Sequence, residues 1–264
     1  MAELHPMLQK VKLPGRIFQL PSRGLMYTNG ELAANITDAE LHVMPMSAYD
    51  EIALKNPDML FSGKALEEVL PICVEGIEKP LDLLGKDVDA LMLYLRLVTY
   101  GPIFELVANH YCSDESKSHV YQVDLEAMLS SINYIDPLNA QDAYKVHLNN
   151  GQIIQLKPLT YKHIVEVLQK NNPAGEDGSD SAEKRKQILL DNLTSIIKSI
   201  DGIEDKELIT QWLRMAPAPY IAQIDRVFDK ANEWGVNLVS ELKCRDCGEI
   251  YKVEVPLNPI SFFS

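Results

Sequence analysis

Cys244 and Cys247 lie in the string CRDCG, whose residue types and spacing could support metal binding or redox chemistry. Two thiolates three positions apart, in a turn that the following glycine helps to fold back, can occupy two corners of a tetrahedral zinc site. Thiol redox chemistry would instead require the motif to open a helix. Because residues 249–255 alternate in the manner of a strand, the sequence favours half of a zinc site over a redox site.

The other half of such a site is expected at Cys112, which closes the string NHYC. This string has the pattern of a degraded knuckle, because it and the CxxC turn are each followed by an alternating strand that ends in Leu. Asn109 occupies the position that corresponds to the first cysteine of a CxxC pair, which a zinc site would require as a ligand. His110 or His119 can replace that cysteine, because imidazole is an accepted zinc ligand.

Two hypotheses stay open for these segments. In the first, three cysteines and one histidine bind a structural zinc ion, with these ligands: Cys112, Cys244, Cys247 and His110. In the second, the segments are metal-free hairpins that have lost their zinc. Both predict that Cys112 lies beside the CxxC turn, because an isolated hairpin buries too little apolar surface to be stable alone. In the metal-free case the contact is expected through Val120, Tyr121, Ile250 and Val253.

Helical periodicity and capping residues predict that most of the chain is helical. The strongest prediction is residues 87–100, where Val88, Leu91 and Leu95 recur at three- and four-residue steps and Gly101 stops the helix. This helix is apolar nearly all round, which indicates the centre of the N-terminal core. Further helices are expected at residues 47–55, 63–74, 104–108, 160–170, 182–200, 205–215 and 219–234.

Extended segments are predicted by alternation and by Pro and Gly punctuation. The clearest is a hairpin over residues 143–158, in which Asn150-Gly151 is typical of a type I′ turn. The polar stretch 171–181 is expected to form a loop. Shorter strands are expected at residues 16–20, 40–44 and 120–125, with two more around the cysteine turn in 238–255.

These elements predict an α+β fold, mostly helical, with an extended N-terminal arm, a β-hairpin and two zinc-ribbon-like half-hairpins. Residues 1–45 are expected to form the arm, and 46–135 a helical core with the first knuckle-like hairpin. Residues 136–237 are expected to form the β-hairpin plus a helical region. Residues 238–264 then form the CxxC hairpin, with a tail that packs back on residues 105–125.

The N-terminal arm is rich in Pro and Gly, which forbids a long helix there. Residues 1–30 are expected to be extended and to contact either the C-terminal β segment or another subunit. At the other end of the sequence, Phe262 and Phe263 are expected to pack on the chain or to anchor a partner, because two adjacent aromatic rings are seldom left in water.

The 264 residues include 38 acidic and 25 basic side chains, for a formal net charge of -13. This excess of acidic side chains argues against sequence-independent binding to nucleic acid and against binding to an anionic membrane, because Lys and Arg make both kinds of contact. The first residues lack a secretory signal, and the most apolar stretch is too short to span a bilayer. Four scattered cysteines indicate a reducing, cytoplasmic site of synthesis. The favoured partners are other proteins.

Enzyme motifs are missing from the sequence. It contains no GxSxG, HExxH or GxGxxG string and no phosphate-cradling Gly loop, so it indicates neither a catalytic site nor a small-molecule substrate. A metal-dependent enzyme is the less favoured alternative, because it would require an open coordination position and a carboxylate base nearby. A zinc-knuckle adaptor for nucleic acid is disfavoured by the negative charge.

Several strings occur in a diagnostic order. They are LPSRGL with Tyr27, MPM at residues 44–46, DE at 50–51 with Leu54 and Asn56-Pro57, Cys73-Val74, LL at 83–84 with Asp87, LR leading to Tyr100-Gly101, the CxxCG turn, and Pro256-Leu257 before Pro259 and Phe262-Phe263. In this order they resemble the baseplate family of T-even-type contractile-tailed bacteriophages, in which the hub-assembly protein is found. The resemblance covers about residues 18–125 and 240–264. Relatives that look similar carry a CxxC where this chain has Asn109.

The resemblance implies a non-catalytic structural or assembly component of a contractile-tail baseplate, in the hub region. It implies contacts with other baseplate and tail proteins, assembly in the host cytoplasm, and a place in the tail of the virion. Two versions stay open, namely a subunit that is retained in the virion and a hub-assembly chaperone that leaves before the particle is complete.

Overall fold

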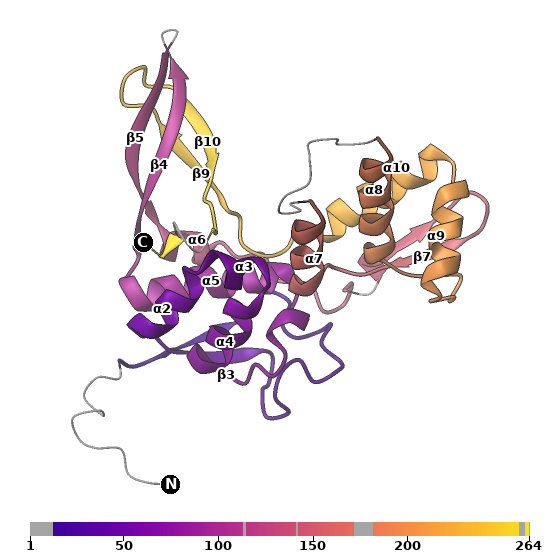
Figure 1. Ribbon diagram of the computed structural model, residues 1–264, viewed down its shortest axis with the longest axis horizontal. Helices are drawn as coiled ribbons and strands as arrows, with labels where there is room; N and C mark the ends of the chain where they lie inside the picture. Colours follow the sequence, from indigo (N-terminus) through magenta and orange to yellow (C-terminus); the bar gives the residue numbers. More distant parts are fainter. Residues whose placement is uncertain (1–12, 113–114, 141, 172–181, 259–261, 264) are drawn as a thin grey trace.

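The computed structural model describes residues 13–112, 115–140, 142–171, 182–258 and 262–263. It has two lobes and, rising from the first lobe, a pair of two-stranded hairpins that lie side by side (Figure 1). The mixture of helices and small antiparallel sheets confirms the predicted α+β class. None of the helices in these residues has the length and apolar character that a bilayer crossing requires.

The first lobe is built around helix α5 (Gly85–Tyr100), as its periodicity predicts. Leu91 and Leu95 are fully buried, and Leu93 on another side of the helix is equally inaccessible, so α5 is surrounded by core on nearly all sides. The remaining helices of the lobe are α2 (Ala48–Leu54), α3 (Pro57–Phe61), α4 (Lys64–Cys73), the 3-10 helix η1 (Pro80–Asp82) and α6 (Leu125–Ser130). Its antiparallel sheet has the order β1-β2-β3, with bounds Arg16–Gln19, Glu40–Val43 and Val74–Glu75.

A local signal explains where helix α2 begins. The Ser47 hydroxyl accepts a hydrogen bond from the Asp50 backbone N–H, and the Asp50 carboxylate accepts one from Ser47 N at 2.8 Å. This capping box satisfies backbone donors that the first turn of a helix leaves open. The predicted helix start at residue 47 is therefore confirmed.

A buried acid ties the N-terminal segment to α5. Asp87 has no exposed surface, and its carboxylate accepts hydrogen bonds from Ser22 N at 2.9 Å and from Tyr27 Oη at 2.6 Å. Burial raises the pKa of Asp87 to about 6, although hydrogen bonds from Ser22 and Tyr27 oppose the rise. The string LPSRG therefore packs on the first lobe of its own chain, and the strands β1 and β2 that flank it belong to the core.

The second lobe has its own hydrophobic core, around the sheet β6-β7-β8. The predicted hairpin is present as β6 and β7, but its turn is not type I′, because Gly151 has a φ of 88° and Asn150 is not among the residues with positive φ. A three-residue loop takes its place, closed by a hydrogen bond from Leu148 N to Gln152 O at 2.9 Å. The elements of this lobe are η2 (Asp142–Tyr144), β6 (Lys145–His147), β7 (Ile153–Leu156), α7 (Tyr161–Asn171), α8 (Ala182–Ile196), β8 (Ile197–Ile200), α9 (Lys206–Met215) and α10 (Ala218–Ala231).

Strand β8 corrects the prediction of a single helix over residues 182–200. The helix ends at Ile196, and the next four residues pair with β7, where Ile200 lies opposite Ile154. Ile197 and Ile200 are buried in this sheet. Branched side chains pack well on a pleated surface, so pairing with β7 outweighs the helical periodicity.

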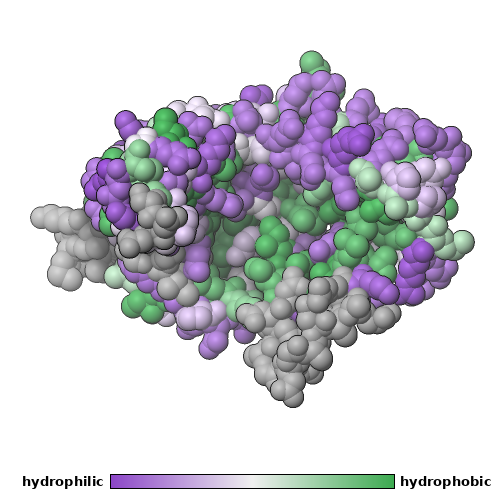
Figure 2. Space-filling model, turned by 90° about the horizontal axis from the view of Figure 1, so that it is seen from above, coloured by the Kyte–Doolittle hydropathy of each residue, from purple (hydrophilic) through white to green (hydrophobic). Residues whose placement is uncertain are grey.

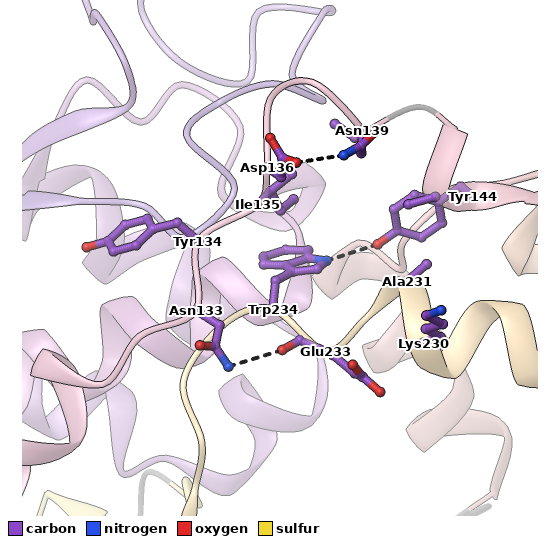
Figure 3. Close-up of a pocket in the computed structure, with 12 residues that line it drawn as sticks. Asn133, Tyr134, Ile135, Asp136, Asn139, Tyr144, Lys230, Ala231, Glu233 and Trp234 are labelled. Carbon is purple, nitrogen blue, oxygen red and sulfur yellow. Dashed lines mark hydrogen bonds between the residues drawn. The ribbon is translucent and has the colours of Figure 1, made fainter.

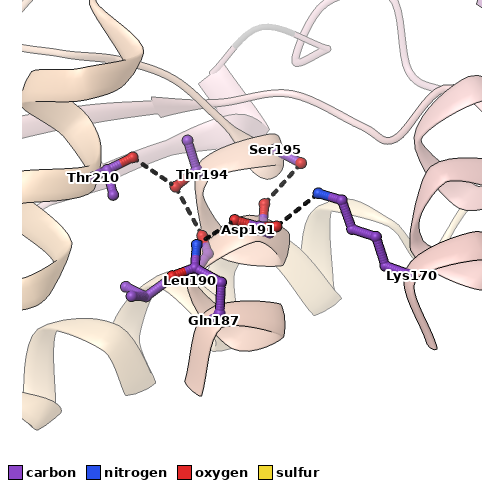
Figure 4. Close-up of polar contacts among 7 residues, drawn as sticks. All are labelled: Lys170, Gln187, Leu190, Asp191, Thr194, Ser195 and Thr210. Carbon is purple, nitrogen blue, oxygen red and sulfur yellow. Dashed lines mark hydrogen bonds and ion pairs between the residues drawn. The ribbon is translucent and has the colours of Figure 1, made fainter. Parts of the chain in front are cut away.

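Polar contacts around Asp191 join α7, α8 and α9 (Figure 4). Lys170 Nζ lies 2.6 Å from Asp191 Oδ2, and Gln187 Nε2 donates to Asp191 Oδ1 at 2.8 Å. Thr194 Oγ1 lies 3.3 Å from Thr210 Oγ1 on α9. An ion pair this exposed contributes at most about 1 kcal/mol, so its main effect is to orient α7 on α8.

The loop predicted at residues 171–181 lies outside the described residues, apart from the end of α7.

The two hairpins are each antiparallel and join parts of the chain that are far apart in sequence. The predicted helix at residues 104–108 is wrong, because Phe104 and Leu106 are buried on one face of a strand while Val107 points outward. A short apolar run does not by itself distinguish a strand from a helix. The predicted strands at 120–125 and around the cysteine turn are confirmed. The four strands are β4 (Ile103–Cys112), β5 (Glu115–Asp124), β9 (Val239–Lys243) and β10 (Ile250–Glu254).

The C-terminal aromatic pair packs on the chain itself. Phe262 and Phe263 have no exposed surface and belong to the core of the first lobe. The Phe262 ring lies 5.0 Å from that of Phe104, and the Arg96 guanidinium lies over Tyr100 at 4.9 Å and over Phe262 at 5.6 Å from the ring centroids. A guanidinium above aromatic faces is electrostatically favourable, so these rings accommodate the charge that α5 buries.

The division of the chain into the four predicted parts stays a prediction.

Candidate functional site

The predicted ligands come together between the two hairpins. Figure 1 shows these hairpins, β4–β5 and β9–β10, side by side. Cys112 ends β4, and His110 lies two positions earlier and therefore on the same face of that strand. Cys244 and Cys247 lie in the turn between β9 and β10. Gly248 closes this turn with a φ of 76° and a hydrogen bond from its N–H to Cys244 O at 3.0 Å, in a backbone conformation that glycine adopts readily.

The distances between the candidate ligand atoms are short. Cys112 Sγ lies 4.0 Å from Cys244 Sγ, although the two residues are 132 positions apart in the sequence. The ligand atoms of His110, Cys244 and Cys247 lie within 4.8 Å of one another, and so do those of Cys112, Cys244 and Asp246. The predicted proximity of Cys112 to the CxxC turn is confirmed, and Cys244 is the residue that both groups share.

Asn109 does not belong to a second knuckle. The string NHYC was predicted to form a turn, but β4 continues straight through it as far as Cys112, which lies opposite Glu115 of β5. Asn109 is exposed on the outer face of β4, whereas Cys112 is buried on the inner face. On a strand, side chains two positions apart share a face, so the useful pair is His110 and Cys112 rather than residues three apart.

Polar contacts fasten the CxxC turn to β5. His119 Nε2 lies 2.8 Å from Asp246 Oδ2, and Lys117 Nζ lies 3.8 Å from the same oxygen. Arg245 donates from Nη2 to the backbone oxygen of Val120 at 2.9 Å. The residues between the two cysteines thus position the turn against β5. His119, weighed from the sequence as a ligand, lies against Asp246.

Aromatic side chains form a second part of the contact between the hairpins. The His110 and Tyr251 rings lie 4.5 Å apart, and Tyr251 meets Tyr121 edge-on at 6.3 Å. Of the residues predicted to join the hairpins, Tyr121 and Val253 face the core, whereas Val120 and Ile250 are 46% and 65% exposed. The prediction was wrong for those two, because they occupy the outward positions of their strands.

The thiols have different acidities. Burial, followed by the neighbouring Cys244 thiol, raises the pKa of Cys112 to about 11. The pKa of Cys244 is lowered, chiefly by hydrogen bonding to the backbone N–H of Cys247, with that of Asp246 acting in the same direction. Burial also raises the pKa of Tyr251 to about 12. A turn whose amides point at a thiolate is suited to holding that thiolate for a cation.

A cavity of about 220 Å³ lies between the lobes (Figure 3). Trp234 Nε1 donates to Tyr144 Oη at 2.9 Å, and Asn133 Nδ2 donates to Glu233 O at 3.4 Å. Trp234 also packs with Leu84 in a small buried cluster. The described lining contains no Cys, His, Ser or Thr, and the Tyr144 hydroxyl is hydrogen-bonded to Trp234 and Asn232 rather than to a carboxylate. These contacts join the two lobes.

A second cavity lies beside β2 and β3. It contains His42, whose Nδ1 is 3.4 Å from Glu75 Oε2. In this cavity, too, the described lining lacks a Ser, Thr, Cys or Lys that such a base could activate. The thiol cluster between the hairpins is therefore the arrangement with the clearest chemistry.

Comparison with known proteins places the chain in a class. A search of curated proteins and a search of solved structures returned no match. A family model described as T4 bacteriophage base plate protein matches residues 37–264, including the helical second lobe where the residue strings are least diagnostic. The chain is therefore a structural component of a bacteriophage tail baseplate. It belongs to the T4 bacteriophage base plate protein family, and this membership implies interaction with other phage tail proteins.

Proposed function

We propose that this protein is a non-catalytic component of the hub region of a contractile-tail baseplate, assembled in the host cytoplasm and acting through protein–protein contacts. The observation that carries the proposal is the family match over residues 37–264. The ordered residue strings, from LPSRGL to the CxxCG turn, support the hub region specifically. The net charge of -13 favours protein partners over nucleic acid or an anionic membrane.

The hairpin pair supplies a surface suited to such contacts. Val107 and Val120 are cross-strand partners on the outer face of β4 and β5, and they are 65% and 46% exposed. Tyr111, on the same face of β4, is 69% exposed. Neighbouring exposed apolar and aromatic side chains on a sheet face are typical of interaction sites. In the view from above, most of the outer surface is hydrophilic and hydrophobic residues gather between the lobes (Figure 2).

The test is cross-linking of assembling baseplates that carry an affinity-tagged form of this chain, read by mass spectrometry. The proposal expects cross-links from residues of β4 and β5 to the central hub proteins. Cross-links confined to peripheral baseplate proteins would contradict the hub assignment while leaving the family unaffected. Mass spectrometry of purified virions then separates a retained subunit from an assembly chaperone that leaves.

The matched variants change the hairpin face without touching a buried residue. Val107→Asp with Val120→Asp is expected to reduce the yield of assembled baseplates in a complementation assay, because two charges replace apolar contact surface. Leu138→Asp is the control, since Leu138 is 89% exposed and lies outside the hairpins. An equal loss in both variants would argue that the hairpin face is not the contact surface.

A further inference from the structure

We propose that Cys112, Cys244, Cys247 and His110 bind one zinc ion that fastens the β4–β5 hairpin to the β9–β10 hairpin. The proposal does not depend on where in the baseplate the protein lies. It concerns the thiol cluster described above, which joins two ribbons from distant parts of the chain.

The spacing of the sulfur atoms fits a tetrahedral ion. Zinc–sulfur bonds of about 2.3 Å at tetrahedral angles place two ligand sulfurs about 3.8 Å apart. Cys112 Sγ and Cys244 Sγ are 4.0 Å apart. The ligand atoms of His110, Cys244 and Cys247 lie within 4.8 Å of one another, and Cys112 adjoins this group through Cys244. A side-chain rotation is needed to bring all four ligand atoms to one centre. Three thiolates with one imidazole form a set that closed structural zinc sites use.

The fourth ligand is His110 rather than Asp246. The Asp246 carboxylate is already engaged by His119 at 2.8 Å and by Lys117 at 3.8 Å. His110 Nε2 is buried and makes no hydrogen bond, since Glu249 lies 3.4 Å away without the required geometry. The Glu249 side chain is 69% exposed, so it can swing into solvent when a cation takes that nitrogen.

Unpaired buried polar atoms point to the same place. Within the described residues, four buried side-chain N or O atoms lack a hydrogen-bond partner, and three of them belong to His110, Tyr121 and Tyr251. The His110 and Tyr251 rings are in contact, and Tyr251 also meets Tyr121. A buried polar atom without a hydrogen-bond partner costs free energy. A cation bound by the His110 ring nitrogen would remove that cost for this atom. No other part of the described chain gathers polar atoms in this state.

The position of the cluster explains what the ion does. A two-stranded hairpin is marginally stable alone, and these two project from the first lobe with one face of each in solvent (Figure 1). A zinc ion with ligands from both hairpins fixes their outer parts at one point. It therefore determines the direction in which the exposed face of β4 and β5 is presented.

A disulfide between Cys112 and Cys244 is the competing use of the same thiols. Bonded sulfurs lie about 2.05 Å apart, and these lie at 4.0 Å, as expected for two ligands of one ion. A disulfide would also leave Cys247 and His110 without a role. Zinc uses all four groups.

The experiment measures metal content and thiol coordination in the full-length protein. Protein purified without chelator is expected to contain one zinc per chain by plasma mass spectrometry. After chelation, Co²⁺ is expected to restore a tetrahedral absorption spectrum with thiolate charge-transfer bands, and Zn²⁺ to displace it. The metal-free protein should show faster hydrogen exchange in residues 103–112 and 244–254, with α5 unchanged.

The variants assign the ligands. Cys247→Ser is the most informative, because Cys247 is exposed and its loss leaves packing intact. It should weaken Zn²⁺ binding by more than the factor of about 10–100 that loss of an outer partner costs. His110→Ala should do the same, and Cys112→Ser should remove a charge-transfer contribution. Cys73→Ala is the thiol control, because Cys73 lies in the core of the first lobe and should leave zinc content unchanged.

Three outcomes overturn the proposal. The first is protein that folds, by circular dichroism, yet neither contains zinc nor binds Co²⁺ after reduction. The second is a Cys112–Cys244 disulfide found by peptide mapping under non-reducing conditions in protein made in a reducing cytoplasm. The third is full Zn²⁺ affinity in His110→Ala together with its loss in Asp246→Ala, which would overturn the ligand set. Zinc at one per chain with loss of affinity in Cys247→Ser and His110→Ala supports it.

Discussion

Helix α5 and the β4–β5 hairpin follow one another along the chain and differ in how much of their surface they bury. Ten of the 16 residues of α5 are buried, and Leu91, Leu93 and Leu95 have no exposed surface. In the hairpin only one face is covered, since Leu106 is buried while Val107 is 65% exposed. Apolar packing therefore surrounds the helix and supports only one side of the hairpin.

The outer part of the hairpin depends instead on a few specific contacts. These are the approach of Cys112 to Cys244, the pairing of His119 with Asp246, and the hydrogen bond from Arg245 to β5. The difference shows that burial sets the stability of the first lobe, whereas side-chain chemistry sets how the hairpins lie on one another. Substitutions in the core of the first lobe should therefore lower the global stability more than substitutions in the outer part of the hairpins. The effects of the hairpin substitutions should stay local.

The largest effect is expected for Leu91→Ala in α5. Leu91 has no exposed surface, and removing its side chain leaves a cavity that typically costs about 2–5 kcal/mol of the free energy of unfolding. Urea denaturation followed by circular dichroism measures the loss. Val107→Ala on the outer hairpin face is the matched control and should change the value by less than about 0.5 kcal/mol. Equal losses would show that the two regions do not differ as described.

The next effect is a dependence of stability on pH that arises in the first lobe. The folded protein holds the Asp87 proton up to about pH 6, whereas the unfolded chain releases it near 3.8. Between these values the folded state binds more protons, so the free energy of unfolding should fall as pH rises, by about 3 kcal/mol for two pKa units. Burial also raises the pKa of Asp89 to about 6, which adds a slope of the same sign.

Asp87→Asn separates the contribution of Asp87 from that of Asp89. Denaturation of this variant between pH 4 and 7 should show a smaller fall in stability than the parent protein shows. An unchanged slope would exclude Asp87 as its source. The hairpin contacts provide the contrast, because hydrogen exchange at the CxxC turn should respond to this substitution far less than exchange in α5.

The smallest effect is expected for His119→Ala at the hairpin contact. His119 and Asp246 have side chains that are 21% and 38% exposed, so their pairing contributes at most about 1 kcal/mol. Global stability should change little, while hydrogen exchange of the backbone amides in residues 244–248 should accelerate. Lys252→Ala is the control, because Lys252 approaches Glu241 at 3.7 Å within one hairpin and away from the turn. Accelerated exchange throughout α5 would contradict the local role of His119.

The sequence predicted best those elements whose signals are local. The Ser47 cap, the periodicity of α5 and the alternation around the CxxC turn each depend on neighbouring residues, and each is confirmed. Strand β8 was missed because only pairing with β7, more than 40 residues earlier, makes residues 197–200 extended. Strand β4 was missed because a short apolar run suits both kinds of element until its burial pattern is known.

The site shows the same limit. The similarity of the two cysteine segments was sufficient to predict that Cys112 approaches Cys244, although NHYC belongs to a strand and not to a turn. The placement of His119 against Asp246 and of Arg245 on β5 was not predictable, because it depends on how the two hairpins are aligned in space. The pair of His110 and Cys112, two positions apart, was the signal for a strand rather than a knuckle.

The burial of Phe262 and Phe263 has a consequence for synthesis of the protein. Their core also contains Phe18, Leu41 and Leu91, so it joins segments separated by more than 150 residues. Core contacts at such separations form late during translation, because the ribosome must first produce the entire second lobe. Until then the nascent first lobe lacks the rings that pack against apolar side chains such as Phe104. The described buried core of the second lobe lies within residues 144–224, so this lobe can fold first.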